Sequence, residues 1–172
     1  MKKVAIPLII AGLLLGSMCQ KNNTTQEGSG IEDLVLPESA FPDGVGWDPH
    51  PPDSTNPALC GVVSNPFVSR SPDFLHCFCT RWVGMSDSMA STARGALVEI
   101  LYHEGEIGIY AIEYESDSAA LAGYEHLTSR YQSVRYTFLL ESKYTIWVWC
   151  DSENDTVYVH RIADYYRNLF GG

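Results

Sequence analysis

The chain has 172 residues with 21 acidic and 11 basic side chains, a formal net charge of −10. That balance argues against nucleic acid as a partner, because phosphate binding relies on clustered lysine and arginine. It also argues against electrostatic attachment of the folded surface to anionic lipids. We therefore expect no nucleic-acid partner, and any membrane contact must depend on something other than surface charge.

Residues 1–18 have the form of an export signal. Lys2 and Lys3 precede an apolar run that is shorter than the ~20 residues needed to span a bilayer as a helix. The small residues and the cysteine that follow resemble the lipobox of bacterial lipoproteins, where cleavage before a cysteine precedes its lipidation. The resemblance predicts lipidation at Cys19, although Met18 occupies the position of a small residue. The alternative is an uncleaved or differently cleaved signal in which Cys19 is incidental.

A polar linker and a single domain are expected after the signal. Residues 19–33 contain the stretch QKNNTTQEGSG, which is small, polar and without apolar spacing, and so predicts a flexible tether. Residues 34–172 are long enough for one domain with its own core. Removing Lys2 and Lys3 with the signal leaves nine basic and 21 acidic residues, a mature charge of −12.

The five cysteines support an exported protein through their parity. If Cys19 carries lipid, the remaining four are Cys60, Cys77, Cys79 and Cys150, an even number that suits an oxidising compartment. Cys77 and Cys79 are two residues apart, and a direct bond between them would close a strained ring. We therefore expect each to pair outward, one with Cys60 and the other with Cys150. Each disulfide would add ~2–4 kcal/mol by restricting the unfolded chain.

The N-terminal half of the domain is predicted to be largely irregular. All nine prolines lie at or before Pro72, whereas all ten tyrosines lie at or after Tyr102. Proline density over 31–73 excludes a long helix or a central strand there. The stretch HCFCTRWV at 76–83 has strand composition, and residues 84–95 are expected to form a loop or a short helix.

The C-terminal half predicts an α+β fold. Its hydrophobic periodicity switches between two and 3.6 residues in the order strand, strand, helix, strand, strand, helix, over 96–102, 107–114, 116–131, 133–140, 144–150 and from about Asp155 onward. Two hairpins, each followed by a helix, predict an antiparallel sheet of four to five strands with both helices on one face. Residues 76–83 are the expected fifth strand, at one edge.

The domain contains the motifs Leu36-Pro37, Gly46-Trp47 and Pro57-x-x-Cys60-Gly61, before a strand, a helix opening in Ser/Asp-Ala-Ala, two strands and a final helix. This pattern resembles small exported sensor-like lipoprotein domains, such as the cysteine-bridged extracellular domain of some bacterial receptor kinases. The resemblance covers roughly residues 34–170 on these turn and periodicity signals. It implies a ligand- or partner-binding module with structural disulfides, and it assigns no functional residue.

No catalytic or metal-binding signature is complete. The stretch GMSDS at 84–88 lacks the second glycine of a G-x-S-x-G elbow, and HEGE at 103–106 lacks the second histidine of H-E-x-x-H. Asp151, Glu153 and Asp155 have the spacing of a calcium loop but not its glycine or its terminal glutamate. We therefore expect no enzymatic activity, no cofactor and no bound metal.

Two groups of residues remain as candidate sites. Trp147 and Trp149 share one face of their predicted strand, so they form an exposed platform for a ligand if helices cover the other face. The favoured alternative is that the proline-rich segment 34–58 buries both indoles as a second small core. The stretch HCFC at 76–79 holds zinc or copper only if its cysteines are reduced, and an exported chain favours disulfides.

These patterns together predict a lipoprotein held at the cell membrane through Cys19, with an extracytoplasmic module that binds a small ligand or an envelope protein. One alternative is a structural or assembly lipoprotein without a small-molecule site. A cleft at the two indoles distinguishes the binding module from that alternative. Another alternative is a small redox or metal protein that uses Cys77 and Cys79, which free thiols or a bound metal would reveal.

Overall fold

The computed structural model describes residues 30–50 and 56–171. The expected signal peptide, Cys19 and residues 20–29 of the expected linker lie outside the described residues. Within the described ranges, none of the helices combines the length and the apolar character that crossing a membrane requires.

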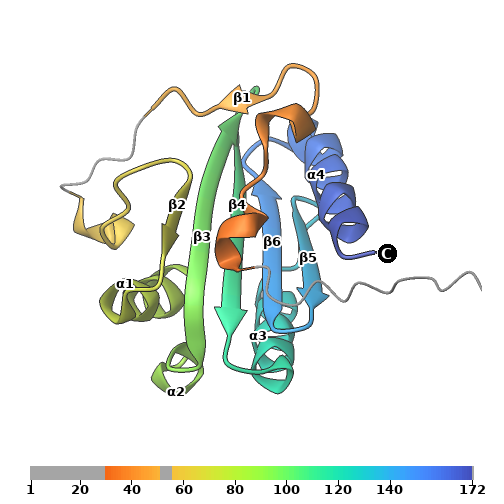
Figure 1. Cartoon of the computed structure of the whole chain (residues 1–172). Helices are drawn as coiled ribbons and strands as arrows, with labels where there is room; N and C mark the ends of the chain where they lie inside the picture. The colour runs from red at the N-terminus through yellow and green to blue at the C-terminus, as the bar shows by residue number, and fades with distance from the viewer. Residues whose placement is uncertain (1–29, 51–55, 172) are drawn as a thin grey trace, which may run out of the picture.

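A six-stranded antiparallel sheet forms the centre of the domain (Figure 1). A long hairpin, β3 and β4, supplies its middle, and β6 and then β5 extend the sheet beyond β4. Two short strands, β1 and β2, pair with the other edge of β3, one after the other along its length. The bounds are β1 (Gly46–Trp47), β2 (Phe67–Ser69), β3 (Ala93–Tyr102), β4 (Glu106–Tyr114), β5 (Tyr136–Glu141) and β6 (Tyr144–Cys150).

Helices cover both faces of this sheet. Figure 1 shows α4 and the N-terminal segment in front of the sheet, with α1 and α3 behind it. We call the two sides the α4 face and the α3 face. The predicted α+β class and the order strand, strand, helix, strand, strand, helix are confirmed. The expectation that both long helices share one face is wrong. The helices are α1 (Pro72–Cys77), α2 (Asp87–Ala90), α3 (Asp117–Arg130) and α4 (Thr156–Leu169).

Side-chain alternation along the hairpin explains this two-sided cover. On β3, Leu97 and Leu101 point into the core under α4, while Ala96 and Val98 point into the core on the α3 face. Because both sets are apolar, exposing either one to water would forfeit its burial energy. The two helices therefore have to divide the faces between them.

The N-terminal segment 31–36, which we call the strap, belongs to the core of the α4 face. It opens with the 3-10 helix η1 (Ile31–Leu34), and Ile31 and Leu34 are at most 1% exposed. Tyr166 of α4 donates its hydroxyl hydrogen bond to the carbonyl of Leu34 at 2.7 Å. Among the described residues the core therefore includes Ile31, which lies within the stretch 19–33 expected to be a linker.

Ion pairs hold the start of the strap against the sheet. The guanidinium of Arg70 donates two hydrogen bonds to the carboxylate of Glu32, at 3.0 and 3.1 Å. Arg70 also lies 2.8 Å from Glu113, whose other oxygen is 2.6 Å from the ammonium of Lys143. A chain of alternating charges thus links the strap to β4 and to the β5–β6 turn.

Residues 76–83, predicted to be an edge strand, are helical instead. Ser71 precedes Pro72, which occupies the first turn of α1, a position where its missing N–H costs nothing. The helix then continues into a π-helical turn, η4 (Phe78–Trp82). Phe74 and Phe78 have helical spacing and are both buried. The strand prediction followed the aromatic composition and missed this helical period.

One disulfide is present among the described residues, between Cys60 and Cys77, with their Cα atoms 5.6 Å apart. Cys79 and Cys150 are free and buried, which corrects the expectation that Cys150 pairs with Cys77 or Cys79. The reason is their placement: Cys79 lies in the core of the α3 face and Cys150 in the core of the α4 face. The sheet separates the two thiols.

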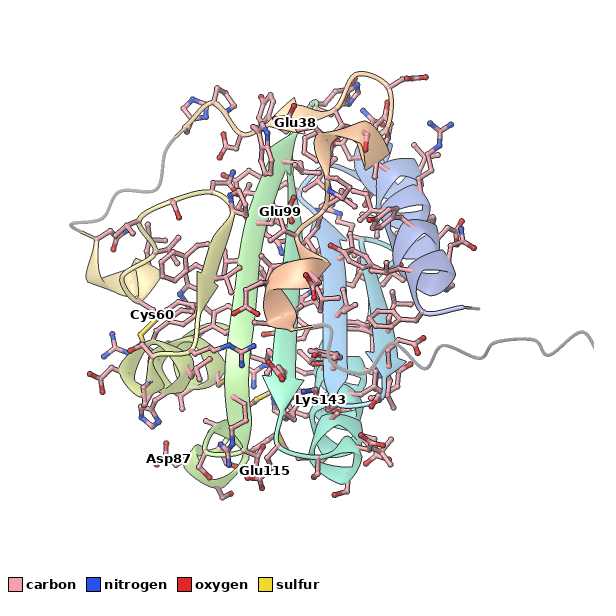
Figure 2. All side chains as sticks on the ribbon, in the orientation of Figure 1. Glu38, Cys60, Asp87, Glu99, Glu115 and Lys143 are labelled. Carbon is pink, nitrogen blue, oxygen red and sulfur yellow. A yellow bond between two sulfur atoms is a disulfide. The ribbon has the colours of Figure 1, made fainter. Side chains whose placement is uncertain are left out.

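A single carboxyl group is enclosed beneath the strap. Glu99 of β3 is 0% exposed, and Figure 2 labels it near the middle of the sheet. Its Oε2 accepts a hydrogen bond from the backbone N–H of Leu36 at 3.1 Å, and its Oε1 has no partner among the described residues. Desolvation raises the pKa of Glu99 to about 7, against the opposing effect of the Leu36 hydrogen bond.

We predict that stability falls as pH rises through the titration of Glu99. The pKa is about 7 in the folded protein and near 4.5 when the group is unperturbed, so the folded state holds this proton more tightly. The free energy of unfolding therefore decreases between these two pH values. Glu99→Gln lacks this titration, so its free energy of unfolding minus that of the wild type should rise by up to about 3 kcal/mol from pH 5 to pH 8. Urea denaturation at both pH values measures this difference.

The matched control is Glu125→Gln, on the exposed side of α3. It should differ from the wild type by the same small amount at both pH values. If Glu99→Gln and the wild type lose stability in parallel, the buried carboxyl does not titrate in this range and the prediction is wrong.

Candidate functional site

The structure places both candidate indoles on the α3 face of the sheet. Trp147 and Trp149 alternate along β6 with Ile146 and Val148, which pack under α4. Trp147 is 7% exposed and Trp149 is half-buried. The favoured sequence interpretation, burial by the proline-rich segment, is not what the structure shows. The described residues 34–47 of that segment pack on the opposite face.

Other aromatic side chains cover Trp147 instead. Tyr131, just after α3, lies over it with ring centroids 4.7 Å apart. Tyr136 and Phe138 of β5 are 6.2 and 5.9 Å away, and Tyr110 of β4 meets it edge-on at 5.3 Å. The indole Nε1 of Trp147 is buried without a hydrogen-bond acceptor among the described residues. The cover is therefore aromatic and leaves one polar atom unsatisfied.

Trp149 lies over a position of β4 that has no side chain. Gly108 is its direct partner across the strands, and a Cβ atom on Gly108 would come within 2.1 Å of the indole. The indole also packs 5.7 Å from the ring of Tyr110. Glycine at this one position lets the indole rest against the sheet backbone.

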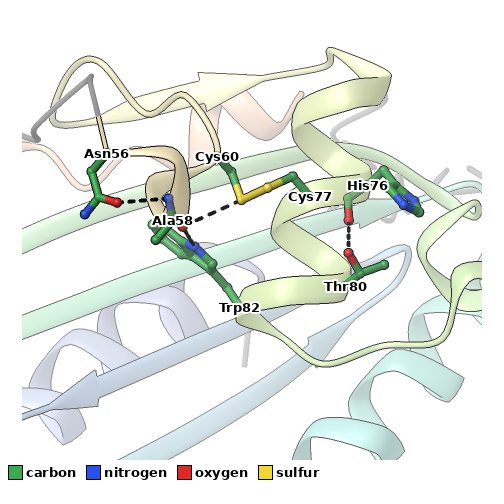
Figure 3. Close-up of a disulfide and its surroundings, with 7 residues drawn as sticks. All are labelled: Asn56, Ala58, Cys60, His76, Cys77, Thr80 and Trp82. Atoms are coloured by element: carbon green, nitrogen blue, oxygen red, sulfur yellow. Dashed lines mark hydrogen bonds between the residues drawn. A yellow bond between two sulfur atoms is a disulfide. The ribbon is translucent and has the colours of Figure 1, made fainter.

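Trp82 of η4 extends the aromatic surface past Tyr110, with the two ring centroids 5.7 Å apart. Its Nε1 donates a hydrogen bond to the carbonyl of Ala58 at 2.5 Å. Figure 3 shows that the Cys60–Cys77 disulfide ties the loop carrying Ala58 to α1, beside Trp82. The indole is therefore fixed in place from both the helix and the loop.

Two cavities open along this aromatic wall, and Trp82 and Tyr110 line both of them. The first, which we call the indole cavity, has a volume of about 360 Å³, and its lining also includes Tyr131, Arg135, Tyr136, Trp147, Trp149 and Asp151. The second, which we call the acidic cavity, has a volume of about 270 Å³, and its lining also includes Asp48, His50, Leu59, Val62, Ile100 and Glu106. Both combine apolar walls with a few polar groups, as small-molecule sites do.

Carboxylates set the charge of the acidic cavity. The side chain of Asp48 is 8% exposed, and its Oδ1 accepts a hydrogen bond from the backbone N–H of His50 at 2.9 Å. Partial burial raises the pKa of Glu106, and the negative charges of Asp151 and Asp48 raise it further. Burial and the charge of Glu106 raise the pKa of Tyr110. Among the described residues no lysine or arginine lines this cavity, and Nδ1 of its one histidine, His50, lies 3.0 Å from Oδ1 of Asp48.

The HCFC stretch brings no metal ligands together. Cys77 is in the disulfide, and burial raises the pKa of Cys79 to about 12, which keeps its thiol protonated and unreactive at neutral pH. His76 is 3.9 Å from Asp87 on the surface. Among the described residues, no three histidine, cysteine or acidic side chains are arranged to hold a metal ion. Cys79 is a free thiol, as the redox alternative requires, but Cys77 is held by Cys60, so the two cysteines of this stretch do not form a dithiol pair.

Sequence reasoning missed the acidic cavity because its residues come from distant segments. Asp48 follows β1, Trp82 lies in η4, and Glu106 opens β4. The run of acids around Glu106 was visible in the sequence. Its meeting with Asp48 and with an aromatic wall was not.

A pair between a partly exposed histidine and a buried aspartate was also missed. Asp155, expected only as a helix start, is 0% exposed, and its Oδ1 is 2.9 Å from Nδ1 of His103. Its Oδ2 accepts a hydrogen bond from the backbone N–H of Gly105 at 3.1 Å. The pair joins the β3–β4 turn to the start of α4, and it lines neither cavity.

Comparison of the chain with models of protein families, with curated proteins and with solved structures finds no match. The fold and the cavities define a small, disulfide-bridged α+β domain with an aromatic-walled concave surface.

We predict that the Cys60–Cys77 bond stabilises the domain and positions Trp82. The bond closes a loop with a sequence separation of 17. Replacing both cysteines with serine should lower the free energy of unfolding by about 3 kcal/mol, the loss expected for a loop of this size. The fluorescence of Trp82 should also change, because the Ala58 carbonyl is no longer held. Urea denaturation and emission spectra measure the two effects.

Adding a reductant provides the control. Reduction should bring the wild type to the stability of the double variant and leave the double variant itself unchanged. A double variant as stable as the oxidised wild type would show that the bond contributes nothing to the fold.

Proposed function

We propose that this protein is a lipoprotein of the cell envelope, tethered to the membrane through Cys19, whose folded domain is a non-enzymatic module that binds a small ligand. The observation that carries the binding function is the pair of cavities on the aromatic wall of the α3 face. Their volumes suit small molecules. Their aromatic side chains provide a large contact area and lose little conformational entropy when a ligand binds.

The unsatisfied indole of Trp147 supports the same proposal. Its buried Nε1 donor has no acceptor among the described residues, which costs free energy unless water or a ligand supplies one. Trp147 also lines the indole cavity, so this unsatisfied donor belongs to a residue that a bound molecule would contact. This is an arrangement that favours a ligand over an empty site.

The purely structural alternative is less well supported. It required the proline-rich segment to cover both indoles and to leave no cleft. Residues 34–47 of that segment pack on the α4 face, and the cleft at the indoles is the feature that distinguishes a binding module.

The membrane tether is proposed from the sequence. Residues 1–18 have the pattern of an export signal, and the cysteine that follows is the expected lipid carrier. A mature charge of −12 repels anionic headgroups, so attachment depends on the lipid. The domain then faces the extracytoplasmic side.

We predict that small aromatic fragments bind at the indoles. The chain has four tryptophans, so labelling with 5-fluorotryptophan gives four fluorine signals, assigned with single Trp→Phe variants. Fragments should shift the signals of Trp82, Trp147 and Trp149. Trp47 packs on the α4 face and provides the internal control. If no fragment moves any of the three signals, the domain has no small-ligand site and the structural alternative replaces this proposal.

We predict that the native protein isolated from its own membrane is cleaved and acylated. Its intact mass should correspond to a chain that begins at Cys19 with acyl groups attached. The mass should also be two hydrogens lower than that of the reduced chain, because one disulfide is present. Cys19→Ser is the matched variant and should lack the acyl mass. A native protein without acyl groups would remove the tether from the proposal.

A further inference from the structure

We propose that the acidic cavity binds a small organic cation, a molecule that carries a quaternary or alkylated ammonium group. This inference rests on the proposed function, because it names the class of ligand for that binding module. Three features of the cavity carry it: its aromatic walls, its unbalanced negative charge and its rigidity.

The walls are two electron-rich rings set at an angle. Trp82 and Tyr110 both line the cavity, with centroids 5.7 Å apart and planes inclined by 48°. The faces of tryptophan and tyrosine attract ammonium groups through the quadrupole of the ring, and angled rings of this kind recognise quaternary ammonium ligands. A purely apolar ligand would gain less from these faces.

The charge favours a cation over a neutral molecule. Among the described residues, Asp48 and Glu106 line the cavity without a lysine or arginine. Asp48 is largely removed from solvent and lies beside the exposed imidazole of His50, whereas Glu106 has no such partner in the described ranges. Attraction between opposite charges is stronger in such a shielded setting than in water. The side chain of Glu106 receives no hydrogen bond from the described residues, so its carboxylate is available to a ligand. Burial raises the pKa of Glu106 most, and the charges of Asp151 and Asp48 raise it further; a bound cation would relieve this second contribution.

An organic cation fits this lining better than a metal ion does. Calcium and magnesium require six or more oxygen ligands, whereas the described lining offers two carboxylates. The amide of Asn65 in the same lining is already bonded to the backbone of Ile100, and the remaining lining is largely apolar and aromatic. A volume of about 270 Å³ accommodates a trimethylammonium group together with a short chain. The ligand is therefore a compact molecule with a diffuse positive charge.

The cavity is held in shape before any ligand arrives. Trp82 is fixed by the Ala58 carbonyl and the adjacent disulfide (Figure 3). On the facing loop, the side-chain amide of Asn65 donates to the carbonyl of Ile100 at 2.6 Å and accepts from its N–H at 2.9 Å. Both walls thus bond to backbone groups, which lowers the entropy lost when a ligand binds.

The test compares choline with 3,3-dimethylbutan-1-ol, its uncharged isostere, on the full mature chain. The readouts are the 5-fluorotryptophan signals and the dissociation constants from their titration. Choline should shift the Trp82 signal and bind at least about tenfold more tightly than the isostere. Glu106→Gln, a change at an exposed position, should raise the dissociation constant of choline about tenfold and leave that of the isostere unchanged. Asp48→Asn should act in the same direction, and Glu125→Gln should have no effect.

The outcomes separate this inference from the proposed function. Equal affinity for the two compounds, or choline binding that survives both acid substitutions, overturns the inference. The same holds if neither compound shifts Trp82 while aromatic fragments still shift Trp147 and Trp149. In each of these cases the binding module remains. If fragments also fail to bind, the proposed function falls together with the inference.

Discussion

The whole structure depends on the β3–β4 hairpin being apolar on both of its faces. A sheet of this kind has to be covered twice, and the chain provides the two covers from different sources. On one face α4 and the strap bury the hairpin completely, down to the carboxyl group of Glu99. On the other face α1, α2 and α3 cover only part of the sheet, and aromatic side chains fill the remainder. The cavities lie where this second cover ends.

The candidate site therefore results from incomplete helical cover, made rigid by local interactions. A π-helical turn presents Trp82, the carbonyl of Ala58 fixes its indole, and a disulfide fixes the loop that carries this carbonyl. Gly108 lets Trp149 lie against the sheet. Each of these devices is small and local, and together they keep a concave aromatic surface from collapsing onto itself.

The sequence predicted secondary structure correctly where the hydrophobic period of a segment was clear. The helix at 117–130 lies within the range 116–131 predicted from its period, and it begins after Ser116, whose hydroxyl accepts the N–H of Ala119. Strand alternation does not reveal which helix covers which face, because residues such as Ile146 and Trp147 are suited to burial on either side. The aromatic composition of residues 76–83 led to a strand prediction and concealed the helix that begins at Pro72. An even number of cysteines predicts disulfides but does not show that Cys79 and Cys150 lie on opposite faces of the sheet. The acidic cavity needs the tertiary structure, since its walls come from separate segments.

The strap has a mechanical consequence. Tension applied to the chain from the N-terminal side of Ile31 reaches the domain first at the Glu32–Arg70 ion pair and then at the bond between Leu34 and Tyr166. These contacts lie on the α4 face, on the opposite side of the sheet from Trp82 and Tyr110. A pull that loosened the strap would therefore uncover Glu99 without acting directly on Trp82 and Tyr110.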